Sequence, residues 1–255
     1  MRPVPLSAAD VLSADFDVFH DTVGSWDNYD RAAFSALHAR AVELSKTDVA
    51  DGNLILAKLA SVLGKDEEVE RWCRNLEHNN FREQAMHMRF QHFVNMGFAT
   101  KGQDILPKII ANRSDQNLVH LMHGAIALGA FNAAKNALEN ADMRKENLGP
   151  TNYIDKIKAN HPVVLELGLE DAHVARMFDE AGAVLREARR NWASYDLSII
   201  ALPRAAGGPA MSVEWPILVS PAEAARLTWL LTDRLVEKEL DLPGFSVGFL
   251  GLTLQ

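Results

Sequence analysis

Residues 54–64 read LILAKLASVLG, a nearly uninterrupted apolar run that closes on Gly64. The run is rich in Leu, Ala and Ile and is long enough to predict a helix. Glycine suits its end, because only glycine adopts the left-handed conformation of a helix terminus without steric cost. A more amphipathic stretch follows at 67–76, where Val69 and Trp72 recur at helical spacing. We therefore expect two helices that fold back on each other across a short glycine turn.

The same pattern recurs along the chain. The glycines that follow an apolar residue in this way are Gly24, Gly64, Gly97, Gly129 and Gly168. The intervals between them are 40, 33, 32 and 39 residues. Second, amphipathic helices are expected at 27–44, 67–76, 103–110, 132–141 and 171–190. The third of these is the weakest, because Pro107 interrupts a helical hydrogen-bond ladder unless it lies in the first turn.

Each second helix has one apolar face, and a single hairpin cannot bury that face by itself. Neighbouring hairpins must therefore stack, which predicts a solenoid whose concave wall is lined by the first helix of each hairpin. An ordinary helical bundle, with glycines after some helices by chance, is the alternative.

The intervals of 33 and 32 residues lead to a family resemblance. Residues 52–145 resemble tetratricopeptide-type repeats, in which a Leu-Gly pair closes the first helix at a period of about 34 residues. Phe93 stands where the family places an aromatic residue, three positions before the residue that precedes glycine, and Ala141 matches its second-helix alanine. The match is partial, and it implies a tetratricopeptide-like helical repeat.

From residue 195 the pattern changes to one of strands. Strands are expected at 195–202, 212–219 and 245–252, with a glycine-rich loop at 203–210. Pro216 has no N–H to donate to a central ladder. We therefore expect the second strand to lie at a sheet edge or to carry a bulge at this residue.

A strong helix start separates the second and third strands. Ser220, Pro221 and Glu223 form a capping box, and the helix is expected to run to about Leu240. Counted from the helix at 171–190, the order is α-β-β-α-β, which predicts two helices over one face of a small sheet. An open edge of such a sheet offers a route to a homodimer.

The expected fold is therefore mostly α, with two units. Residues 1–168 form a helical-repeat domain and residues 169–255 a small α+β domain, and the helix at 171–190 is placed to pack on both.

Composition narrows the class of protein. With 255 residues, 48% of them hydrophobic, the chain can close a substantial core. The net charge of −8 disfavours nucleic acid and anionic lipid as partners. A lone cysteine, Cys73, makes no internal disulfide and suits a reducing compartment, so we expect a cytoplasmic location. We expect neither a signal peptide nor a membrane span, because no apolar run reaches about 18 residues.

Histidines mark the candidate binding site. His120 and His123 are three residues apart and share a helix face. When the repeats are aligned on their glycines, Met88 stands at the position of His120 one hairpin earlier, and Gln91 at the position of His123. Lys58 stands at the position of His123 one hairpin earlier still. The solenoid would bring these residues to one patch on or near its concave wall. The alternative is that the histidines are hydrogen-bonded within the packing.

We expect no metal, cofactor or catalytic residue in this patch. Zinc would require further ligands, and the sequence has no His-Glu-x-x-His or Cys-x-x-Cys spacing. It also has no Walker, Gly-x-Gly-x-x-Gly or Gly-x-Ser-x-Gly motif, so a common nucleotide-binding enzyme is disfavoured.

Three functions remain from the sequence. The first is a non-enzymatic interaction or adaptor protein that binds a peptide or protein segment in a concave groove, with the C-terminal unit free to dimerise or to bind a second partner. The second is an acidic, immunity-type inhibitor of a basic partner. The third is a hydrolase that depends on a metal or on His120 and His123.

Overall fold

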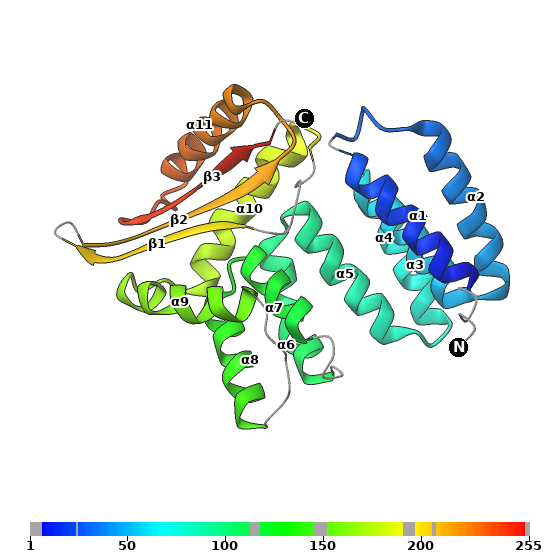
Figure 1. Cartoon of the computed structure of the whole chain (residues 1–255), viewed down its shortest axis with the longest axis horizontal. Coiled ribbons are helices and arrows are strands. Elements are labelled where there is room, and N and C mark those ends of the chain that lie inside the picture. The colour runs from blue at the N-terminus through cyan, green and yellow to red at the C-terminus, as the bar shows by residue number, and fades with distance from the viewer. Residues whose placement is uncertain are drawn as a thin grey trace, which may run out of the picture.

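The computed structural model describes residues 7–23, 25–112, 118–144, 152–190, 197–205 and 208–252 (Figure 1). The helices are α1 (Ala8–Thr22), α2 (Arg31–Thr47), α3 (Val49–Val62), α4 (Asp66–His78), α5 (Arg82–Met96), α6 (Ala99–Asn112), α7 (Leu118–Ala127), α8 (Phe131–Met143), α9 (Asn152–Glu166), α10 (Asp171–Glu187) and α11 (Pro221–Glu237). The strands are β1 (Ser198–Ala205), β2 (Gly208–Ile217) and β3 (Phe245–Gly251).

The predicted helix–glycine–helix units are confirmed. Gly64, Gly97, Gly129 and Gly168 have φ angles of 64°, 62°, 74° and 61°, the left-handed values that favour glycine at a helix end. They separate α3 from α4, α5 from α6, α7 from α8, and α9 from α10. Gly24, the first glycine of the pattern, lies outside the described residues.

The hairpins stack in sequence order, as the solenoid requires. Each first helix contacts the next one, from α1 to α3, α3 to α5, α5 to α7 and α7 to α9. Figure 1 shows this series running from α1 at one end of the molecule to α9 beside the sheet. The first helices therefore form a continuous wall.

Helix α6 differs from its prediction. It begins at Ala99 rather than near Gln103, so that Pro107 lies in its interior, and the helix continues to Asn112. A proline inside a helix costs about 3 kcal/mol. Leu106 and Ile109 on either side of it are almost completely buried, and each contributes about 1.5–3 kcal/mol, which offsets that cost.

The sheet has the order β1-β2-β3, in which β1 and β2 are antiparallel and β2 and β3 are parallel. The predicted loop at 203–210 is wrong, because Ala205 pairs with Gly208 and both strands extend into that range. Tyr195 and Asp196, the first residues of the predicted strand, lie outside the described residues.

The prediction for Pro216 is also wrong, because its strand is the central one. The described pairs of the β1–β2 ladder end at Ser198 and Glu214, two residues before Pro216. Pro216 stands opposite Leu250 in the parallel pairing with β3. Pro216 thus lies beyond the described β1–β2 pairs, so its lack of an N–H interrupts none of them.

Three helices hold the sheet against the repeats. α9 contacts β1 and β2, while α10 and α11 contact β3 and each other. One side of β2 is buried through Met211, Val213 and Trp215, whereas Ile200 and Leu202 of β1 are exposed on the other side. On α11, the Thr228 hydroxyl accepts a hydrogen bond from the Phe249 N–H at 2.9 Å, so the helix also covers the outer edge of β3.

The cores follow this arrangement. One hydrophobic cluster runs from Phe90 of α5 to Phe249 of β3, and two smaller clusters fill the space among α1, α2 and α3 and among α3, α4 and α5. Because α10 also contacts α5, α6 and α8, it belongs to the packing of both the repeats and the sheet.

Candidate functional site

A pocket opens between α5 and α7, two neighbouring first helices. Its volume is about 270 Å³. The lining residues are His87, Phe90, Gln91 and Val94 of α5 and His120, Leu121, His123 and Gly124 of α7. The structure therefore brings together Gln91, His120 and His123, three of the residues that the repeat alignment placed in one patch.

Two residues of that predicted patch lie elsewhere. Met88 is only 2% exposed and packs with Ala57 and Ala60 of α3, so it cannot line an open groove. Lys58 lies against α1, with its ammonium 5.6 Å from the centre of the Phe16 ring. The glycine alignment gave the correct helices but not the rotation of α5, nor the position of α1 over α3.

His87 was missing from the predicted patch and belongs to the pocket. It stands one turn before Gln91, so the spacing of four residues would have found it. His92, five residues after His87, points elsewhere, because it is 3% exposed and lies in the core.

The pocket owes its shape to a glycine. A Cβ atom on Gly124 would lie 2.6 Å from Cε1 of Phe90 and 3.2 Å from Cγ2 of Val94, so glycine lets α7 approach α5 without displacing the Phe90 ring. Phe90, Val94 and Leu121 are buried and form an apolar floor. Gln91 and His120 are exposed at the rim. The result is an apolar recess with polar groups around its mouth.

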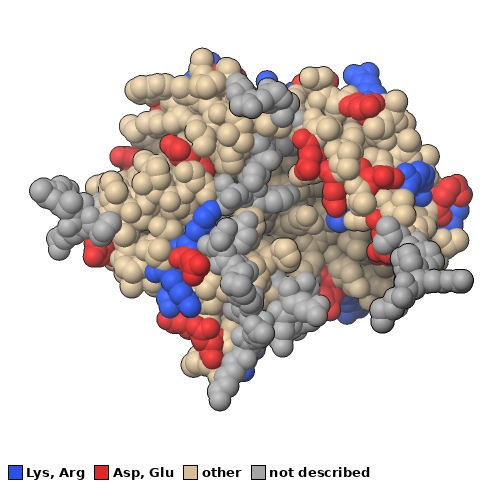
Figure 2. Space-filling model, viewed as in Figure 1, with Lys and Arg blue, Asp and Glu red and all other residues tan. Residues whose placement is uncertain are grey.

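The surface near this pocket is concave. Figure 2 shows a hollow near the centre of the view, over the position of α5 in Figure 1, with Asp and Glu side chains beside it toward α1. Helix α1 carries exposed Asp10, Asp17 and Asp21. The hollow thus lies on the wall of first helices.

The histidines of the pocket do not form a metal centre by geometry. Within the described ranges, no group of three or more His, Cys, Asp and Glu side chains is arranged to hold a metal ion.

A second polar cluster lies deeper, between α3, α4 and α5. The Ser61 hydroxyl is 3.0 Å from Nδ1 of His92, and Oδ1 of Asp66 is 3.1 Å from Nε2 of the same ring. The Asn95 amide also donates to the Ser61 hydroxyl, at 3.3 Å. Sequence reasoning missed this cluster, because its members are far apart in the chain and follow no motif.

This cluster has the residue types of a nucleophilic triad but not its access. Ser61 is 0% exposed and His92 3%, so a substrate carbonyl cannot reach the hydroxyl. The hydrogen bonds instead satisfy buried polar groups and join three helices.

Arginines near the end of α10 are also structural. Arg186 donates to the carbonyl oxygens of Met96 and Gly97, which end α5. Arg189 donates to Asp27 at 2.7 Å. These contacts fix α10 to the repeats.

Comparisons with protein-family models, with curated proteins and with solved structures found no match to this chain. None of the helices in the described part of the chain combines the length and the apolar character needed to cross a membrane.

Proposed function

We propose that this chain is an interaction protein with tetratricopeptide-like helical repeats, and that the pocket between α5 and α7 anchors a peptide or a protein segment. The cytoplasm, where a lone cysteine stays reduced, is part of the same proposal.

The observation that supports it most is the apolar floor of Phe90, Val94 and Leu121 inside a polar rim. Pockets that hold drug-sized ligands span about 300–1,000 Å³. A volume of about 270 Å³ is just below that range and suits one apolar side chain of a longer segment.

The rim suits the peptide backbone. The Gln91 amide offers both donors and an acceptor, and a neutral imidazole such as that of His120 offers one of each. Because both residues stand on helices, their backbones are already ordered, and binding loses little conformational entropy there.

A display selection tests this proposal. Peptides that bind the wild-type protein are selected from a random library, and their dissociation constants are measured for Gln91→Ala and His120→Ala. Loss of a rim hydrogen bond is expected to weaken binding by about 5–10-fold, or about 1 kcal/mol. Both residues are exposed, so the thermal midpoint should stay within about 2 °C.

Two matched variants serve as controls. Lys108 is exposed on α6, and Lys58 lies under α1, so alanine at either position should leave peptide affinity unchanged. Peptides that bind the two rim variants as tightly as the wild type would remove the pocket from consideration.

A further inference from the structure

A second depression lies between α2 and α4, the second helices of the first two hairpins. Its volume is about 760 Å³. It is separate from the α5–α7 pocket, because no residue lines both.

Basic side chains converge on this depression. Arg71, Arg74 and His78 stand on one face of α4, at spacings of three and four residues, and His38 reaches it from α2. The chain as a whole has a net charge of −8, so this cluster of basic groups differs in sign from the average surface.

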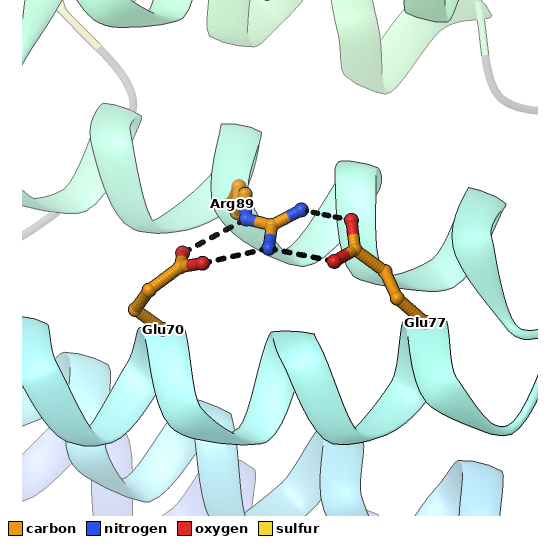
Figure 3. A network of polar contacts seen from close by, with 3 residues as sticks. All are labelled: Glu70, Glu77 and Arg89. Atoms are coloured by element: carbon orange, nitrogen blue, oxygen red, sulfur yellow. Dashed lines mark hydrogen bonds and ion pairs between the residues drawn. The ribbon is translucent and has the colours of Figure 1, made fainter.

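The nearest carboxylates on either side of Arg74 are already engaged. Figure 3 shows Arg89 of α5 between Glu70 and Glu77 of α4. Its guanidinium donates to both Glu70 oxygens, at 2.8 and 2.9 Å, and to both Glu77 oxygens, at 2.5 and 3.2 Å. These bonds lower the pKa of Glu77. Arg89 thus pairs with the carboxylates of Glu70 and Glu77, which stand one turn before and one turn after Arg74.

The two arginines of the depression keep their donors for a ligand. Among the ion pairs of the described residues, none within 4.0 Å involves Arg71 or Arg74. The Arg71 guanidinium lies 4.6 Å from the centre of the Trp72 ring, which holds its plane in place and leaves its edge open.

We infer that this depression is an anion site that takes the phosphate group of a small organic phosphate. Two guanidinium forks offer paired N–H donors in the geometry that phosphate oxygens accept. The imidazoles of His38 and His78 add donors from both sides. Val42 and Trp72 supply apolar surface next to the cations, where the organic part of the ligand would lie.

Calorimetric titration at low ionic strength tests the inference with three probes: inorganic phosphate, phenyl phosphate and phenol. Both phosphates are expected to bind the wild-type protein saturably, phenyl phosphate the more tightly, and phenol is expected not to bind. Arg71→Ala and Arg74→Ala should each weaken phenyl phosphate by about tenfold, the loss expected for a hydrogen bond to a charged group.

Lys108→Ala removes one positive charge from exposed α6 and is the matched control, with no expected change in affinity. Arg71 and Arg74 are exposed, so circular dichroism should show folded variants with an unchanged thermal midpoint. The inference is overturned by a wild-type protein that binds neither phosphate, by arginine variants that bind as the wild type does, or by phenol binding alone. None of these results bears on the peptide pocket between α5 and α7.

Discussion

Replacing Gly182 by alanine tests the junction that holds α10 against α5. Helix propensity alone predicts a gain of about 1 kcal/mol, because glycine is a poor residue for a helix interior. The packing predicts the reverse. A Cβ atom at Gly182 would lie 2.2 Å from the Gly97 carbonyl oxygen and 2.7 Å from the Gly97 carbonyl carbon.

The size of the effect follows from these contacts. The two atoms that block the Cβ are backbone, so α10 itself must move away by about 1 Å, beyond the range of good van der Waals contact. Overpacking of this kind costs about 1–3 kcal/mol. The shift also disturbs Arg186, whose Nη1 would lie 2.7 Å from the new atom and which bonds the Met96 and Gly97 carbonyls. After the gain in propensity, we expect a net loss of about 2 kcal/mol.

Urea denaturation followed by circular dichroism measures this loss. Gly168→Ala is the matched control, because no atom lies within 4 Å of its new Cβ and the only cost is the left-handed φ of 61°, about 1 kcal/mol. The variant at 182 should unfold at a lower urea concentration than this control. A Gly182→Ala protein as stable as the wild type, or more so, would refute the close packing of α10 on α5.

Three further predictions concern buried and bridging groups. Arg89→Ala should lower the free energy of unfolding at pH 7 by about 1 kcal/mol, discounted for partial exposure. The Arg89 hydrogen bonds lower the pKa of Glu77 in the folded state, so this stabilisation is fully present above the unfolded-state pKa of about 4.3. It is lost as the pH falls through the lower pKa of the folded state. A difference in unfolding free energy between variant and wild type that is equally large at pH 7 and pH 3 would contradict this. Burial raises the pKa of the Cys73 thiol to about 12, so iodoacetamide at pH 8 should modify it only after unfolding in urea, and rapid labelling of the native protein would show the thiol to be accessible. Ser61→Ala leaves Nδ1 of His92 without its 3.0 Å partner and should cost about 1–3 kcal/mol in thermal or urea unfolding, whereas an unchanged stability would mean that the buried bond contributes nothing.

Local chemistry made the hairpins predictable. The glycine turns could be found because a left-handed helix end selects glycine, and Gly64, Gly97 and Gly129 all adopt that conformation. The helix at 221–237 could be found for a similar reason, since Ser220 accepts from the Glu223 N–H as an N-cap residue does. The other half of the predicted capping box is not formed, because the Glu223 carboxylate accepts from Arg226 instead.

Features set by distant neighbours were not predictable in the same way. Whether Met88 or His87 faces the pocket depends on how α5 is rotated between α3 and α7, which no local pattern reports. The place of Pro216 in the central strand depends on the pairing of β2 with both β1 and β3, which no local pattern reports. The contact between Ser61 and His92 joins residues 31 positions apart and exists only after the first helices have stacked.

Chemical-shift mapping with a selected peptide tests the central claim most directly, because it reports where on the wall of first helices a ligand binds. The account predicts the largest changes at Gln91, Val94, Leu121 and His123, on the two sides of the α5–α7 pocket. Changes confined to the sheet or to α2 and α4, with the amides of α5 and α7 undisturbed, would contradict it.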